Sequence, residues 1–182
     1  MSKVKNIDGT PHFPVVSLFS GAMGLDIGLM QAGLNIAVSQ DYDKWCVETI
    51  KKNGHVGVLG DIRELINQDP SCDFLLKAGG LKKDSVFAVV GGPPCQSFST
   101  AGKRLGVEDE RGQLYNQFIH VVDQLRPRFF VMENVKGLAS TLVDPADKQS
   151  LPLLDHILEK FKALGYHTVH GVLDAVHYGT PQ

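Results

Sequence analysis

Short apolar runs alternate with longer amphipathic stretches along most of the chain. The apolar runs are rich in β-branched residues and are continuous rather than alternating. That pattern is typical of strands covered on both faces of a parallel sheet. It predicts strands at residues 14–19, 35–41, 57–62, 85–92, 128–134 and 167–173.

The amphipathic stretches repeat their apolar residues every three or four positions, which indicates helices. They lie at residues 24–33, 43–54, 113–127 and 151–166. Asp43 is placed to cap the second of these helices. Strands that alternate with helices predict an α/β fold with a doubly wound, mostly parallel sheet. We expect one domain over residues 14–182, preceded by a polar extension at residues 1–13.

The composition changes this picture little. Of 182 residues, 43% are hydrophobic and 21% are charged, as in an ordinary globular protein. No apolar run approaches the roughly 20 residues that cross a membrane, and the N-terminus has no apolar signal core. Three irregularly spaced cysteines argue against a disulfide framework and favour a reducing cytoplasm. A net charge of −2 gives no overall attraction to nucleic acid, so any DNA-binding surface is a local patch or lies elsewhere.

Candidate chemistry gathers where the predicted strands end, which is where open α/β sheets bind ligands. Glycines at 21, 24 and 28 follow the first strand, although turn or packing roles explain such spacing equally well. Asp41 ends the second strand and is placed to accept hydrogen bonds from ribose hydroxyls. Tyr42 next to it can stack on adenine or cover the sheet edge, and Asp61 ends the third strand. Together these residues indicate a site for an adenosine-containing cofactor.

The fourth strand runs into "GGPPCQSFSTAG", which holds Cys95 on a stiff backbone, since Pro93 and Pro94 have a fixed φ and no N–H. A thiol aimed in this way suits a nucleophile. Most free cysteines are small buried hydrophobes instead, and we interpret Cys46 in that way and Cys72 as a loop residue. Glu133 ends the adjacent fifth strand, where a partly buried carboxyl beside the thiol can act as a hydrogen-bonding acid.

Five stretches together resemble, in order, motifs of the cytosine carbon-5 DNA methyltransferases of the bacterial type, a family that includes restriction-modification enzymes. They are "FSGAMGLDIG", "GGPPCQSFSTAGKR", "EDERGQLY", "MENV" and "HYGTPQ". The resemblance implies a class I, Rossmann-like methyltransferase fold with S-adenosylmethionine as cofactor and double-stranded DNA as partner. It also implies a cofactor site made of Phe19, Gly21, Gly24, Leu25, Asp41, Tyr42, Asp61, Ile62, Pro94 and Leu114. Met23 departs from the family, which usually has glycine there, and we expect it to tighten the turn.

The resemblance assigns Cys95 as the nucleophile that attacks carbon-6 of cytosine and Glu133 as the group that contacts the base. Residues 96–112 resemble the loop that closes over DNA, with Gln96, Ser99, Lys103, Arg104 and Arg111 as its contacts. The base must leave the duplex for this chemistry to occur. A thiolate that adds to carbon-6 makes carbon-5 nucleophilic enough to take a methyl group.

Other interpretations remain open at this point. A nicotinamide-dependent oxidoreductase shares the glycine loop but does not explain Cys95 with Glu133, and an RNA cytosine methyltransferase shares the chemistry. A metal site is not expected, because His167 and His170 would face opposite sides of a strand. The family's target-recognition region and last cofactor motif have no counterpart here. We therefore expect an N-terminal portion that is inactive or nearly so alone, or the cofactor-binding half of a split enzyme with a second chain.

Overall fold

The computed structural model describes residues 13–94, 114–143 and 149–180. The chain divides into two compact units, residues 1–134 and residues 135–182. None of the helices among the described residues is long and apolar enough to cross a membrane.

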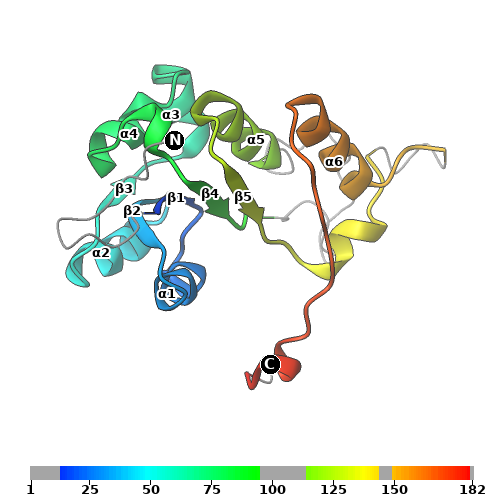
Figure 1. Ribbon diagram of the computed structural model, residues 1–182, viewed down its shortest axis with the longest axis horizontal. Coiled ribbons are helices and arrows are strands. Elements are labelled where there is room, and N and C mark those ends of the chain that lie inside the picture. The colour runs from blue at the N-terminus through cyan, green and yellow to red at the C-terminus, as the bar shows by residue number, and fades with distance from the viewer. Residues whose placement is uncertain (1–12, 95–113, 144–148, 181–182) are drawn as a thin grey trace. The chain divides into compact units, whose positions relative to one another are not determined.

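The first unit is built on a parallel five-stranded sheet in the order β3-β2-β1-β4-β5 (Figure 1). The chain moves outward from β1 to β3 on one side and from β4 to β5 on the other, so β1 and β4 flank the point at which the strand order reverses. This arrangement confirms the predicted doubly wound α/β fold. The strands are β1 Pro14–Leu18, β2 Asn35–Asp41, β3 Gly57–Leu59, β4 Ala88–Gly91 and β5 Phe129–Met132.

Helices cover both faces of this sheet. Figure 1 shows α1 and α2 on one face and α3, α4 and α5 on the other. Their bounds are α1 Gly24–Gln31, α2 Lys44–Lys52, α3 Ile62–Gln68, α4 Asp73–Gly79 and α5 Leu114–Leu125, with a 3₁₀ turn, η1, at Lys83–Ser85. Asp43 caps α2 as predicted, because its carboxylate accepts the backbone N–H groups of Trp45 and Cys46. The sequence pattern did not predict α3 and α4, and the predicted third strand is shorter than expected because Ile62 already begins α3.

The core of this unit lies between the central strands and their helices. Every residue of β1 and β4 is buried. Val15, Ile36 and Val90 form one cluster, against which Leu29 and Met30 of α1 pack. Burying an aliphatic side chain of this size stabilises a fold by about 1.5–3 kcal/mol. The central strands therefore form a firm platform for the loops that leave their carboxyl ends.

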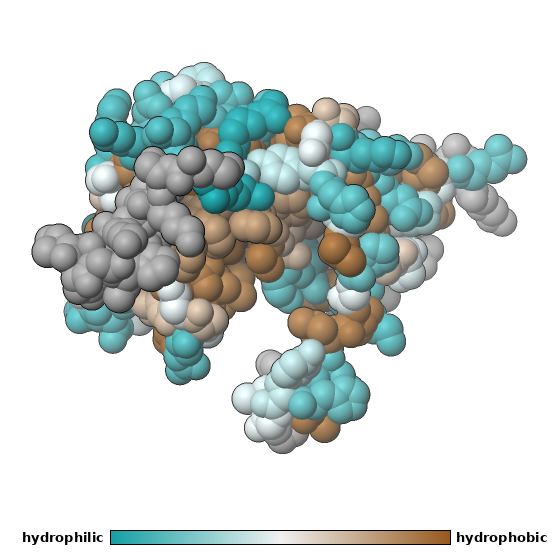
Figure 2. All heavy atoms as spheres, viewed as in Figure 1, coloured by the Kyte–Doolittle hydropathy of each residue, from teal (hydrophilic) through white to brown (hydrophobic). Residues whose placement is uncertain are grey.

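The second unit contains η4 Lys136–Ser140, α6 Leu153–Ala163 and η5 Ala175–Tyr178. Leu153, Ile157 and Phe161 are buried at helical spacing along α6, which packs against η4. The predicted strand at residues 167–173 is wrong, since this segment has no regular structure and pairs with no strand among the described residues. A strand needs a neighbour for its backbone hydrogen bonds. Val169 is 91% exposed, and Figure 2 shows apolar atoms along the same segment.

Candidate cofactor and catalytic site

A cavity of about 140 Å³ lies at the carboxyl ends of the strands in the first unit. Four chain segments that follow β1, β2, β3 and β4 contribute to its wall, together with the start of α5. Aromatic and aliphatic side chains dominate the lining, and one carboxylate and one guanidinium provide charge. The lining residues are Phe19, Gln40, Tyr42, Asp61, Ile62, Arg63, Pro94 and Leu114.

Six of the ten residues predicted to hold the cofactor line this cavity. They are Phe19, Tyr42, Asp61, Ile62, Pro94 and Leu114. The other four lie on neighbouring parts of the same strand ends without lining the cavity: Gly21, Gly24, Leu25 and Asp41. Segments that are more than 90 residues apart in the sequence thus meet at the carboxyl ends of the strands.

The loop between β1 and α1 has an unusual backbone. Phe19, Gly21 and Met23 have φ values of 54°, 53° and 69°, in the left-handed region. This conformation is unfavourable for Phe19 and Met23, by roughly 1–2 kcal/mol each. Burial of the Met23 side chain, which is 3% exposed, offsets that cost. The position at which the family usually has glycine therefore keeps a conformation that glycine favours.

Asp41 fixes this loop against β2. One oxygen of its buried carboxylate accepts the Gly21 N–H at 2.7 Å, and the other accepts the Asp43 N–H at 2.8 Å. A carboxylate oxygen has a second lone pair, so both oxygens can accept a further donor such as a ribose hydroxyl. Asp41 is thus built to hold the loop whether or not a ligand is bound.

Asp61 is held by Arg63 from two directions. Its carboxylate accepts the Arg63 backbone N–H at 2.9 Å, which caps α3, and forms a salt bridge with the guanidinium at 2.6 Å. The hydrogen bonds from the Arg63 side chain are the main reason that the pKa of Asp61 lies below its usual value, with partial burial acting in the opposite direction. Asp61 therefore presents a fixed negative charge at the cavity wall.

Glu133 lies beside the segment that leads to Cys95. A Cβ atom added to Gly92 would approach Oε2 of Glu133 to 2.8 Å, so a side chain at position 92 would displace the carboxylate from this position. The Glu133 N–H donates to the Gly91 carbonyl at 3.0 Å, and the Asn134 side chain donates to the Pro93 carbonyl at 2.9 Å. Glu133 is exposed rather than partly buried, because β5 lies at the edge of the sheet.

Cys95 itself and the predicted loop residues Gln96, Ser99, Lys103, Arg104 and Arg111 lie outside the described residues. The two described cysteines are poor nucleophiles. Burial raises the pKa of the Cys72 thiol to about 12, and burial with the nearby Asp41 and Asp43 raises that of Cys46. Cys72 is fully buried in the core rather than an ordinary loop residue. Since nucleophilic attack needs the thiolate, this chemistry favours Cys95 over both.

Sequence reasoning missed two cavity residues, Gln40 and Arg63. Ser39, Gln40 and Asp41 form an unbroken run of buried polar residues at the end of β2. Ser39 and Ser17 donate their hydroxyls to the buried Asp26 at the start of α1, which the sequence reasoning also did not single out. Three polar residues that close an apolar strand are a signal that each has a specific partner, and this signal was available in the sequence.

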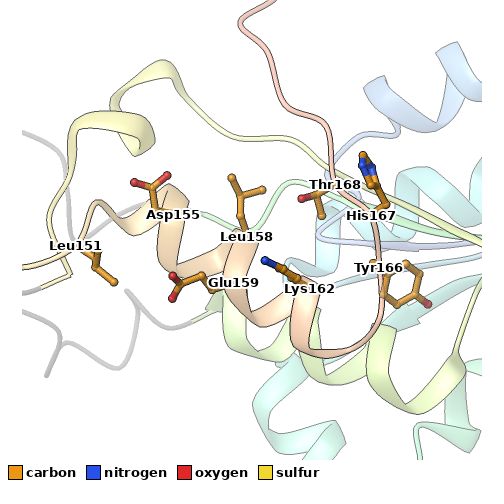
Figure 3. Close-up of a pocket in the computed structure, with 8 residues that line it drawn as sticks. All are labelled: Leu151, Asp155, Leu158, Glu159, Lys162, Tyr166, His167 and Thr168. Carbon is orange, nitrogen blue, oxygen red and sulfur yellow. The ribbon is translucent and has the colours of Figure 1, made fainter.

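A larger cavity of about 510 Å³ lies in the second unit, and Figure 3 shows the side chains that line it. Asp155, Glu159 and Lys162 of α6 supply its charges, opposite residues 166–168. It contains none of the residues predicted for the cofactor. Since it lies at no strand end, the smaller cavity is the better nucleotide site. Among the described residues, no group of three metal-ligating side chains comes together.

The fold is the doubly wound α/β fold of solved methyltransferases. The S. pombe Dnmt2 methyltransferase has the same fold, with a TM-score of 0.63 and 20% identity over 92% of this chain and 45% of that structure. Residues 13–182 match the family model of the C-5 cytosine-specific DNA methylases. The chain belongs to this family.

Relatives with assigned activities support the same conclusion. The chain is 37% identical to the Type II methyltransferase M.FnuDI of Fusobacterium nucleatum over 92% of its own length and 43% of that protein. It is 39% identical to the Type II methyltransferase M.AquIA of Picosynechococcus, again over 92% of its length and over 67% of the relative. The chain thus spans about two fifths of the first relative and two thirds of the second. Because the chain belongs to this family, the alternative of a nicotinamide-dependent oxidoreductase is excluded.

Proposed function

We propose that this chain is the cofactor-binding and catalytic portion of a DNA cytosine-5 methyltransferase. One observation carries the proposal beyond family membership. Residues from four strand ends line one cavity, and Glu133 lies beside the backbone that leads to the candidate nucleophile. A DNA cytosine methyltransferase needs this combination: a nucleotide site, and a thiol and a carboxyl group that activate the cytosine, all at the carboxyl ends of the strands.

The residues present fit the adenosine end of S-adenosylmethionine. Phe19 and Tyr42 offer ring faces and Ile62 offers an apolar surface, while Asp61 offers an acceptor for an exocyclic amino group. A cavity of about 140 Å³ is smaller than the roughly 300–1,000 Å³ of a typical small-molecule site, so it suits the adenine rather than the whole cofactor. Asp41 holds the ribose, and the loop with Gly21, Gly24 and Leu25 lies against the rest. When bound, the cofactor supplies an electrophilic methyl group.

The chain's own residues activate the cytosine. The Cys95 thiolate forms a bond to carbon-6, and the electron pair of the carbon-5–carbon-6 double bond becomes available at carbon-5. The Glu133 carboxyl group, when it carries a proton, donates a hydrogen bond to ring nitrogen-3, which stabilises the charge that develops on the ring. After carbon-5 is methylated, a base removes its proton and the electron pair expels the Cys95 thiolate.

The target is a cytosine in double-stranded DNA that is flipped out of the helix, because the ring carbons are not accessible inside the base stack. Lys103, Arg104 and Arg111 contact the DNA backbone. Recognition of the target sequence is proposed to come from regions that the longer relatives carry beyond the matched portion, on the same chain or a second one. The net charge of −2 supports this division, since phosphate binding needs a basic surface. A reducing cytoplasm suits the catalytic thiol.

The covalent step can be tested on its own with DNA that contains 5-fluorocytosine. Fluorine at carbon-5 leaves no proton to remove, so the Cys95 adduct persists and survives denaturing electrophoresis. With the target-recognition region supplied on the same chain or a second one, we expect an adduct that needs both the cofactor and DNA, and its complete loss in Cys95→Ser.

Cys46→Ser is the matched control, because it removes a thiol at the same end of the sheet and should leave the adduct unchanged. Transfer of labelled methyl to cytosine carbon-5 of unmethylated DNA tests the full reaction in parallel. An adduct that persists in Cys95→Ser would contradict the proposed nucleophile. A folded chain that binds no S-adenosylhomocysteine would contradict the proposed function.

A further inference from the structure

Gln40 lies between two walls of the cavity, one formed by Phe19 after β1 and the other by Gly60 and Asp61 after β3. It lies in the middle of the sheet's β1-β2-β3 side, paired with Leu18 on β1 and with Val58 on β3. The residue is 1% exposed, yet its side chain lines the cavity. A buried amide of this kind is stabilised only if its polar ends find partners.

The side-chain amide of Gln40 connects both walls. Its Nε2 donates to the Gly60 carbonyl at 2.7 Å, on the loop after β3. Its Oε1 accepts the Phe19 N–H at 3.5 Å, a long hydrogen bond from the loop after β1. The partners fix the orientation of the amide, since a carbonyl can only accept and an N–H can only donate.

The two backbone groups that Gln40 holds lie directly beside cavity residues. Phe19 has a left-handed φ of 54°, so its loop needs a fixed partner to keep the ring in place. Gly60 has no side chain of its own, and a Cβ there would crowd Leu65 at 3.1 Å. The Gly60 carbonyl belongs to the peptide group that joins Gly60 to Asp61. Its position therefore fixes the backbone of Asp61, which lines the same cavity.

We propose that Gln40 is a positioning residue that sets the width of the adenine cavity by holding the Phe19 wall and the Gly60–Asp61 wall at a fixed separation. This inference rests on the proposed function, because it assumes that the cavity takes the adenine of the cofactor. It assigns Gln40 no part in methyl transfer itself. It explains why a neutral amide, rather than an apolar residue, occupies this buried position near the end of β2.

Two substitutions separate the two hydrogen bonds. Gln40→Met keeps the volume of the side chain and removes both bonds. Gln40→Glu, studied at a pH at which its carboxyl is ionised, keeps the acceptor for Phe19 and removes the donor for Gly60. Val38→Ala is the matched control, because it perturbs a fully buried residue two positions earlier on the same strand without touching the cavity.

The experiment combines amide hydrogen exchange of the free chain with calorimetric binding of S-adenosylhomocysteine. In Gln40→Met, we expect exchange about tenfold or more faster at Phe19, Gly60 and Asp61, and affinity at least about tenfold weaker. In Gln40→Glu, faster exchange should be confined to Gly60 and Asp61. Val38→Ala should lower the melting temperature without either local effect.

Several outcomes would overturn the inference. Unchanged exchange at the two loops in Gln40→Met would show that the amide does not hold them. If Val38→Ala loses as much stability as Gln40→Met and also as much affinity for S-adenosylhomocysteine, the affinity loss is a general structural effect. A wild-type chain with protected sheet amides that binds no S-adenosylhomocysteine would refute the proposed function and this inference together, whereas normal binding by Gln40→Met would refute this inference alone.

Discussion

Asp61 and Arg63 show how a single residue pair sets the charge of the cavity. The Arg63 guanidinium lies against both carboxylate oxygens, and its hydrogen bonds lower the pKa of Asp61. A carboxyl group with a lowered pKa stabilises the fold above its unfolded pKa of about 3.9. That contribution is lost as the pH falls through the pKa of the folded state. The pair should therefore contribute at neutral pH and not in strong acid.

Substitution of Arg63 tests this pair. We expect Arg63→Ala to reduce the free energy of unfolding at pH 7 by at most about 1 kcal/mol, as is usual for a partly exposed ion pair. The difference from the wild type should begin to shrink below about pH 4, where Asp61 becomes protonated in the unfolded state, and should disappear only below the lowered pKa of the folded state. Denaturant unfolding at pH 7, 5 and 3.5 measures it. Arg63→Lys keeps the charge and serves as the control; a difference that does not depend on pH would contradict the role of Asp61.

At the scale of single residues, sequence motifs indicated most of the cavity but not its internal connections. Phe19, Tyr42 and Ile62 were expected from their places in motifs, and all three line it. Gln40 and Arg63 were not expected, because their importance depends on the register between strands and on a helix start. Hydrogen bonds between loops that are 20 residues apart are not visible in a linear pattern.

At the scale of elements, the end of strand β4 makes a tight contact with the end of β1 at Gly91 and Leu18. A Cβ atom on Gly91 would lie 2.4 Å from the Leu18 carbonyl oxygen, which is a severe overlap with backbone. These two strands flank the point where the sheet order reverses, and the cavity opens at their ends. The close contact between these two strand ends thus depends on glycine at position 91, which has no Cβ atom.

Gly91→Ala should therefore destabilise the first unit. We expect a loss of about 1–3 kcal/mol in the free energy of unfolding, the usual cost of overpacking. Gly28→Ala is the matched control, since the same methyl group at this position in α1 meets no atom within 4 Å. In a helix that change should be neutral or stabilising by up to about 1 kcal/mol. Equal effects of the two substitutions in denaturant unfolding would refute the steric argument.

The elements themselves were predictable to different degrees, for physical reasons. Long apolar runs predicted β1, β2, β4 and β5, because burial on both faces leaves a clear pattern. The seven-residue helices α3 and α4 were missed, since so short a segment shows barely two turns of periodicity. The segment 167–173 has an apolar pattern but forms no strand, because a strand also depends on a pairing partner that local sequence does not reveal.

At the scale of the whole molecule, residues 167–173 are poorly protected compared with the rest of the described chain. Val169, Val172 and Leu173 are 91%, 68% and 77% exposed. Exposed backbone without regular hydrogen bonds is the preferred substrate of proteases. Among the described residues, we expect chymotrypsin to cut first after Tyr166 or Leu173, as mass spectrometry of a brief digest will show. First cuts within α5 or the sheet would contradict this expectation.

The contact between Gly92 and Glu133 also restricts how this protein can be varied. Since a Cβ at position 92 would lie 2.8 Å from the Glu133 carboxylate, the two positions are not independent in a mutational library. Gly92→Ala should displace the exposed Glu133 carboxylate, which can rotate away, and should therefore change the position of the acid more than the stability of the fold. A glycine without any chemistry of its own thus helps to determine where the acid beside it lies.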